Sequence, residues 1–226
     1  MLQEIFSLLF GPNPELREII GVTLRMSFFS TLISAFLGLP LGVLLSGNEF
    51  RGRSWITRVV NTLMGLPPVV AGLIVFLLLS RSGPLGSLRL LYSVQAMVIA
   101  QVLLITPIIT GLTANLVSLR AASIRETCAG IGLNAYQRLW YTVLECRVPF
   151  ISTIVAGFGR AIAEVGAVQM VGGNIQYKTR VMTTAIMMQT NMGHFEFAIA
   201  LGGVLLLLSF LINSAVHYIQ ELDSRA

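Results

Sequence analysis

The chain has 226 residues, of which 55% are hydrophobic and 11% charged, and its mean hydropathy is +0.81. A soluble domain has about a quarter of its residues charged, so this composition excludes a soluble globular protein. The formal net charge of +5 reflects an excess of Lys and Arg. Membrane proteins use such an excess to set their orientation, so it gives no ground for nucleic-acid binding.

Five long apolar stretches with few charges follow one another along the chain. Each can cross a hydrocarbon core of about 30 Å at about 1.5 Å per residue, and the alternating pattern of a membrane barrel is absent. Backbone groups in lipid must then be satisfied within helices. We predict an all-α membrane protein with about five transmembrane helices, at 19–46, 57–79, 90–112, 148–170 and 197–219.

The two ends of the chain are short. Residues 1–18 contain two prolines and no basic region, so they are unlike a cleaved signal peptide and are predicted to lie at the membrane interface. Residues 220–226 form a short tail after the fifth stretch.

The distribution of Lys and Arg predicts the orientation, because cytoplasmic connections carry more of them. The N-terminus and the second and fourth connections together hold five, whereas the first and third connections and the C-terminus hold eight. This difference places the N-terminus outside, and the third connection and the C-terminus in the cytoplasm.

Two of the connections are long. The third, 115–147, is rich in helix formers but too polar to span, and its pattern predicts two short helices broken near Gly130 and Gly132. The fourth, 171–196, begins at a Gly-Gly pair and carries a short helical pattern over about 180–189. This second helix could re-enter the membrane only if protein or a wet cavity surrounds it.

Three ionisable residues, Arg25, Arg160 and Glu164, lie inside predicted spans. A charge at membrane depth costs at least about 2.5–3.5 kcal/mol and needs a partner or a wet path. Arg160 and Glu164 are four residues apart on one helix face and can pair, but Arg25 and Glu164 both fall in the outer half of the membrane, so this pairing stays open. A guanidinium also suits transient attraction of an oxyanion.

Prolines and glycines mark three further positions. Pro67 and Pro68 in the second span predict a kink, either static or acting as a gate near mid-membrane. Gly172, Gly173 and Asn174 could offer donors to an oxyanion or form a plain turn. Small residues in the fourth span, among them Gly157, favour close helix packing.

Nothing in the sequence predicts a nucleotide or metal site on this chain. The only lysine, Lys178, does not follow glycine as a phosphate-binding loop requires. Cys128 and Cys146 have no metal-ligand spacing and are predicted to be free thiols, and His194 and His217 stand apart from other ligands. The methionines around Met188 are predicted to be flexible packing rather than a cation site.

The segment ETCAGIGLNAYQRLWYTVLE, at 126–145, resembles the cytoplasmic motif of the membrane subunits of ABC importers. That motif begins with Glu and two small residues and has Gly six positions after the Glu, as Glu126 and Gly132 do here. Thr127 and Cys128 stand where alanines are usual, and Glu145 stands where a proline usually closes the motif. The resemblance implies a coupling helix within 115–147 that docks on an ATPase through Glu126, Thr127, Cys128, Ala129, Gly130, Gly132 and Arg138.

A second stretch, AGFGRAIAEVGAVQMVGGNI at 156–175, is similar to the corresponding helix of molybdate and tungstate permeases, with GGNI closest to the tungstate branch. Together with LPPVVAGL at 66–73, it implies that 19–219 is a type I ABC importer transmembrane domain. The path or gate would then include Arg25, Pro67, Pro68, Arg160, Glu164, Gly172, Gly173 and Asn174.

The resemblance implies a tungstate permease of the cytoplasmic (inner) membrane that works by alternating access and is not itself an enzyme. Its working unit would be a homodimer in lipid with two ATP-binding cassette subunits, which hold ATP and Mg, and an external solute-binding protein. The alternatives are a molybdate or sulfate importer permease, or an ion-coupled secondary anion carrier that uses Glu164. A carrier would predict internal repeats, which the sequence lacks.

Overall fold

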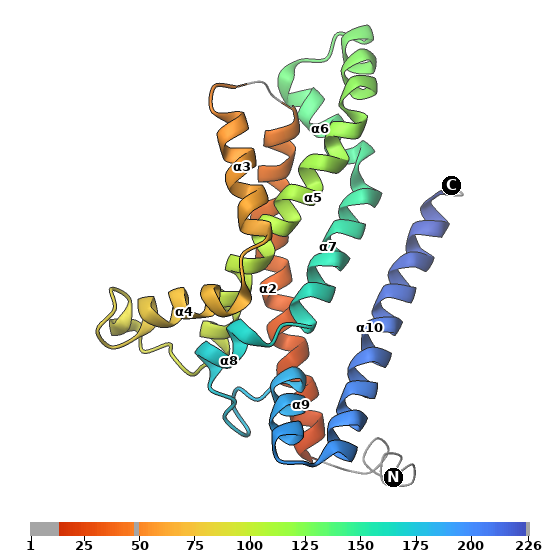
Figure 1. Cartoon of the computed structure of the whole chain (residues 1–226). Helices are drawn as coiled ribbons and strands as arrows, with labels where there is room; N and C mark the ends of the chain where they lie inside the picture. Colours follow the sequence, from red (N-terminus) through yellow and green to blue (C-terminus); the bar gives the residue numbers. More distant parts are fainter. Residues whose placement is uncertain (1–13, 48–49, 225–226) are drawn as a thin grey trace.

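The computed structural model describes residues 14–47 and 50–224, and within these ranges it contains helices and no strand (Figure 1). The long helices are α2 (Pro14–Gly47), α5 (Val94–Gly130) and α10 (Phe195–Ser224). The shorter elements are α3 (Arg53–Met64), α4 (Pro68–Leu79), η1 (Gly86–Leu88), α6 (Ala135–Glu145), α7 (Arg147–Ile162), α8 (Gly166–Gly172) and α9 (Met182–Asn191).

Three of the predicted spans correspond to single helices. Helices α2, α5 and α10 are each long and apolar enough to cross a membrane. Pro40 and Pro107 lie inside α2 and α5 without ending them, as neighbouring helices allow in membrane proteins. The all-α membrane architecture is confirmed: the described residues hold three such helices, or up to five spans if each of two bent pairs, α3 with α4 and α6 with α7, forms one span.

The second predicted span, 57–79, is divided at the kink predicted for Pro67 and Pro68, and the break is sharper than a kink within one helix. Helices α3 and α4 meet at an angle of 100°, and α4 runs across the direction of α3 (Figure 1). Pro67 is extended, with φ −61° and ψ 128°, and Pro68 is the first residue of α4. Because neither proline has an N–H to continue the α3 ladder, the helix ends here and a new one begins.

The fourth predicted span, 148–170, is wrong as a single helix. Helix α7 ends at Ile162 and α8 begins at Gly166. No proline lies at this break, so the proline rule that identified the first break gave no signal here.

The third connection is broken where the sequence predicts, but its first half is not a separate helix. Helix α5 continues from the membrane region as far as Gly130, so one helix of 37 residues contains both the third span and the start of the connection. Gly132 has φ +68°, which glycine adopts without strain. Helix α6 then starts at a capping box, in which Asn134 Oδ1 accepts from Gln137 N (2.9 Å) and Gln137 Oε1 accepts from Asn134 N (2.9 Å).

The core is centred on the contact between α2 and α5. A Cβ at Gly42 would lie 2.5 Å from Thr113 Cβ, so only glycine allows this approach. Nearer α6, a second apolar cluster contains both cysteines. They are free thiols, as predicted, and the structure shows that both are buried. Burial raises the pKa of the Cys146 thiol, and Arg120 opposes that shift.

Of the predicted N-terminal segment 1–18, residues 1–13 lie outside the described residues, and the rest belongs to α2. At the other end, α10 continues through most of the predicted tail, as far as Ser224.

Candidate functional site

Two helix breaks lie against each other, and we call residues 65–68 and 163–166 together the break site. The second break, between α7 and α8, contacts the first directly: a Cβ at Gly166 would lie 2.9 Å from Val69 Cγ2 and 3.5 Å from Pro68 Cβ. A Cβ at Gly72 would lie 2.7 Å from Ala167 Cα, so α4 and α8 pack backbone to backbone. Discontinuous helices of this kind form substrate paths in transporters, because they expose backbone groups inside the membrane.

The break site carries an ion pair between Arg160 and Glu164. Arg160 Nη1 and Glu164 Oε2 are 2.7 Å apart, and the side chains are 36% and 3% exposed. Of the two pairings that the sequence left open, the structure has this one. Arg25 lies on an exposed side of α2, and no ion pair joins it to Glu164 in the part of the chain that is described.

Glu164 also starts α8. Its second oxygen, Oε1, accepts a hydrogen bond from Ala167 N (3.0 Å), which satisfies one of the free N–H groups at the beginning of the helix. Its backbone carbonyl accepts from Thr183 Oγ1 of α9 (2.7 Å). A carboxylate that is buried, paired and bonded in this way is fixed in place, because moving it would leave several polar groups unsatisfied.

A buried glutamine, which the sequence analysis missed, holds the end of α7. The Gln101 side chain is 0% exposed. Its Nε2 donates to Ala161 O on α7 (2.8 Å), and its Oε1 accepts from Ser30 Oγ on α2 (2.6 Å). Gln101 therefore connects three helices beside Arg160. A lone amide in an apolar run was the available signal, because such a group must find partners.

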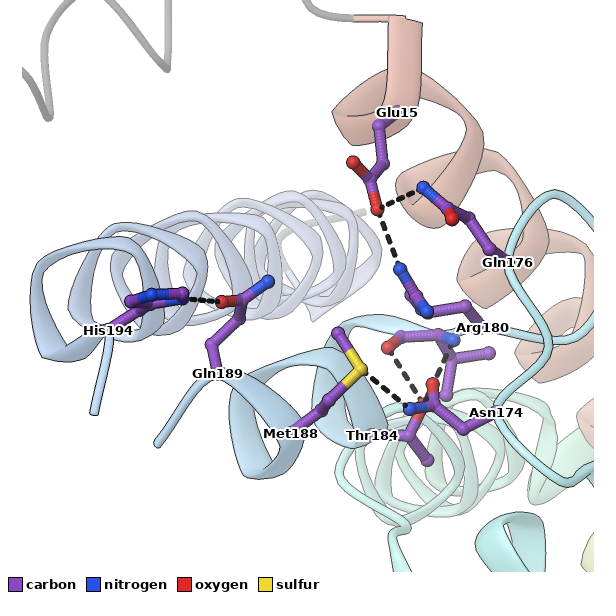
Figure 2. Close-up of polar contacts among 9 residues, drawn as sticks. Glu15, Asn174, Gln176, Arg180, Thr184, Met188, Gln189 and His194 are labelled. Atoms are coloured by element: carbon purple, nitrogen blue, oxygen red, sulfur yellow. Dashed lines mark hydrogen bonds and ion pairs between the residues drawn. The ribbon is translucent and has the colours of Figure 1, made fainter. Parts of the chain in front are cut away.

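The predicted Gly172, Gly173 and Asn174 lie at the last residue of α8 and in the turn that follows it. Gly172 O accepts from Thr179 Oγ1 (2.6 Å), and Gly173 N donates to Gln169 O (3.1 Å). Asn174 Oδ1 accepts from Thr184 Oγ1 (3.0 Å), and its Nδ2 donates to Met188 Sδ (3.4 Å), as Figure 2 shows. Two of the donors proposed for an oxyanion, Gly173 N and Asn174 Nδ2, are thus engaged within the chain, as in a plain turn.

The same turn is tied to the start of α2. Arg180 Nη1 and Glu15 Oε1 are 2.7 Å apart, and Gln176 Nε2 donates to the same oxygen (3.1 Å) (Figure 2). Met182 N donates to Thr23 Oγ1 (2.9 Å). These contacts pack α9 into the molecule, so the short helix expected at about 180–189 exists and the first half of it is buried by protein.

The predicted coupling residues lie around the junction of α5 and α6, at the end of the molecule farthest from α9 (Figure 1). Glu126, Thr127, Ala129, Gly130 and Gly132 are exposed, and Arg138 is half-buried. Cys128 is instead buried in the cluster beneath α6. Exposed apolar residues extend this surface along α6, including Tyr136, Leu139 and Trp140.

No group of three or more His, Cys, Asp or Glu side chains that could hold a metal occurs among the residues described. The methionines near the turn are partly core, since Met182 is 0% exposed. His194 Nδ1 lies 2.9 Å from Gln189 Oε1 (Figure 2).

Similar proteins cover almost the whole chain. The tungstate uptake system permease protein TupB of Peptoclostridium acidaminophilum is 41% identical over 95% of this chain and 94% of its own length. The protein of the same name from Campylobacter jejuni is 35% identical over 95% and 90%. The molybdenum transport system permease protein ModB of Azotobacter vinelandii is more distant, at 27% over 88% and 91%.

A family model that describes binding-protein-dependent transport system inner membrane components matches residues 38–221, from the second half of α2 to the last turn of α10. It contains the break site and the α5–α6 junction. The chain therefore belongs to this family of multi-pass membrane transport permeases.

Proposed function

We propose that the chain is the permease subunit of an ATP-driven importer that carries tungstate. The observation that carries this proposal is the similarity to two tungstate uptake permeases along almost the full length of each protein. The molybdenum permease is less similar over a comparable length, and sulfate permeases are about as distant, at 24–26% identity. Molybdate and sulfate are therefore the secondary candidates.

The working complex would be a homodimer with two ATPase subunits on the cytoplasmic side and a solute-binding protein outside. ATP and Mg would bind to the ATPases. Closure of the ATPases would act on the exposed surface of the α5–α6 junction. Because α5 is one helix of 37 residues, a push at its Gly130 end would reach the break site through a rigid element.

The break site would be the part of the path that opens and closes. A bend of 100° at the prolines and a second break beside it give two short helices, α4 and α8, that can move together. Arg160 is 36% exposed at the side chain, so its free donors can attract a passing dianion while Glu164 holds the guanidinium. A paired arginine binds an anion weakly, which suits release.

The proposed location is the cytoplasmic (inner) membrane, with the N-terminus outside and the C-terminus inside. The relative placement of the elements supports this topology. The start of α2 lies at the α9 end of the molecule, and α10 runs from that end toward the α6 end (Figure 1). The third connection, with its four arginines, then faces the cytoplasm, as the distribution of basic residues favours.

The test is metal uptake in cells with and without this chain, at nanomolar external tungstate, molybdate or sulfate, with tungsten and molybdenum counted by elemental mass spectrometry. We expect loss of tungsten uptake alone. Loss of molybdenum instead would keep the importer and change its substrate. Unchanged uptake of both metals would contradict the proposal.

The energy source separates the importer from an ion-coupled carrier. In vesicles, depletion of ATP should stop uptake, whereas an ionophore that collapses ion gradients should leave it intact. Inhibition by the ionophore at constant ATP would favour a carrier that uses Glu164.

A further inference from the structure

A hollow of about 880 Å³ lies between the end of α4 and the start of α5, and two arginines line it. Arg81 follows α4, and Arg89 follows η1. Ser87 and Tyr92 add hydroxyl groups to the same lining. We call this feature the arginine hollow. The end of α4 and the start of α5, which flank it, lie in the half of the molecule away from α6 (Figure 1), where the proposed topology places the outside.

The charge of the two arginines is not balanced locally. The sequence contains no Asp or Glu between Glu49 and Glu126. In the described ranges, the ion pairs of Arg160 and Arg180 lie elsewhere, and none is found at Arg81 or Arg89. Both Arg81 and Arg89 are exposed, so their forked donors are accessible. Guanidinium groups bind tetrahedral oxyanions through two parallel N–H donors, and a concave surface of one charge sign concentrates counter-ions.

The lining is built in a defined shape. Arg89 and Tyr92 have φ values of 51° and 61°, a conformation that non-glycine residues adopt only where the surroundings impose it. Tyr92 N donates to Val171 O (3.0 Å). A Cβ at Gly173 would lie 2.8 Å from Tyr92 Cδ1, so the ring rests on the turn after α8. The arginine hollow is thereby fixed to the element that leads to the break site.

From these observations we propose that the arginine hollow is a receiving site for a tetrahedral oxyanion. Arg81 and Arg89 hold the anion by charge and by forked hydrogen bonds, after the binding protein releases it and before it passes α8. The arginine hollow is open and its arginines are exposed, so it holds the anion only transiently. Transfer of the anion into the transport path requires such weak binding. The inference rests on the proposed tungstate function for the identity of the anion. The site itself does not, because phosphate groups of lipids share the same chemistry.

A direct test labels the arginine hollow with thiol reagents. Ser87→Cys places one reactive thiol there, because the two native cysteines are buried. The purified permease is studied in phosphatidylcholine nanodiscs without its binding protein. We expect an anionic methanethiosulfonate to react about tenfold faster than a cationic one. Adding Arg81→Gln and Arg89→Gln should remove this preference, whereas Arg17→Gln, an exposed arginine at the start of α2, should leave it.

Competition then identifies the anion. Sodium tungstate should slow the anionic labelling of Ser87→Cys, and it should not slow labelling by an uncharged reagent of similar size. If phosphatidylglycerol in the nanodisc protects the thiol and tungstate does not, the arginines bind lipid phosphate and the receiving site is refuted. Equal labelling by anionic and cationic reagents would refute it as well.

Uptake into phosphatidylcholine proteoliposomes, with the ATPases inside and saturating binding protein outside, tests the role in transport. The double variant Arg81→Gln/Arg89→Gln should lower the maximal rate about tenfold and leave unchanged the concentration of loaded binding protein that gives half the maximal rate. A rise in that concentration at an unchanged maximal rate would mean that the arginines dock the binding protein, and would overturn the proposal. If the unaltered protein carries no tungstate, the proposed function fails, while the labelling results still decide the site.

Discussion

At the scale of single residues, Arg160 and Glu164 form a pair whose two members are unequally buried, at 36% and 3% exposure of the side chains. Arg160→Ala leaves a buried carboxylate without its partner. We expect a loss of stability smaller than the about 3–5 kcal/mol typical of a fully buried pair, because water reaches the arginine. The thermal unfolding midpoint in detergent and tungstate uptake measure the effect.

The control removes the stranded charge and keeps the helix cap. Arg160→Ala combined with Glu164→Gln retains an oxygen that can accept from Ala167 N, which Glu164 Oε1 does now (3.0 Å). This double variant should be more stable than Arg160→Ala alone. A double variant that is less stable than the single one would show that Glu164 does not depend on Arg160.

A substitution at Gln101 gives a second test of the break site. Gln101→Leu keeps the size but leaves Ala161 O without this donor and Ser30 Oγ without this acceptor, inside the protein. A buried polar group that loses its partner costs about 1–3 kcal/mol. We therefore expect a lower unfolding midpoint and slower uptake. Gln95→Leu, at an exposed glutamine in the first turn of α5, should change neither. An equal effect of both variants would contradict this role of Gln101.

The sequence predicted a pair between Arg160 and Glu164, but it did not predict the role of Gln101. The spacing of four between Arg160 and Glu164 is a local signal. The partners of Gln101 are 60 and 71 residues away, and only the folded chain brings them together. The engagement of Asn174 with Thr184 and Met188 was hidden for the same reason.

At the scale of elements, hydropathy predicted where the apolar segments lie but not where they break. An average over a window of about 20 residues is the same for a straight helix and for two short ones. Pro67 and Pro68 gave a signal for a kink, and the structure enlarges it to 100°. The α7–α8 break depends on tertiary contacts instead: the Glu164 carbonyl bonds to Thr183, and Gly166 packs on Val69.

The prediction at the scale of elements concerns the α5–α6 junction and its docking role. A Cβ at Gly132 would have no atom within 4 Å, so Gly132→Trp fits the fold in space but projects from the proposed docking surface. We expect the chain to insert and assemble, with ATP hydrolysis uncoupled from uptake. The ratio of ATP hydrolysed to tungstate imported in proteoliposomes measures this coupling.

The matched control separates bulk from backbone strain. Gly132 has φ +68°, which costs a non-glycine residue about 1–2 kcal/mol. Gly132→Ala carries this strain without the bulk and should remain coupled at slightly lower stability. Unchanged coupling in Gly132→Trp would remove the junction from the docking surface, whereas loss of coupling in Gly132→Ala would assign the effect to the backbone.

At the scale of the whole molecule, the two proposed partners require opposite ends. The α5–α6 junction lies at one end, and the start of α2, α9 and the turn after α8 lie at the other (Figure 1). Single-cysteine labelling tests this polarity. Arg17→Cys, at an exposed position of α2, should react with a membrane-impermeant maleimide in intact spheroplasts. Tyr136→Cys, on α6 and 77% exposed, should react only after permeabilisation, in cells without the ATPase.

The native cysteines should not react with the maleimide in this experiment. Cys128 and Cys146 are buried, and burial raises the pKa of the Cys146 thiol. At neutral pH, a raised pKa lowers the fraction of reactive thiolate, so the unaltered chain should stay unlabelled until it unfolds. Labelling of Tyr136→Cys in intact spheroplasts would invert the topology and put the α5–α6 junction outside. An ATPase could not reach it there, and the arginine hollow would then face the cytoplasm and could not receive an incoming anion.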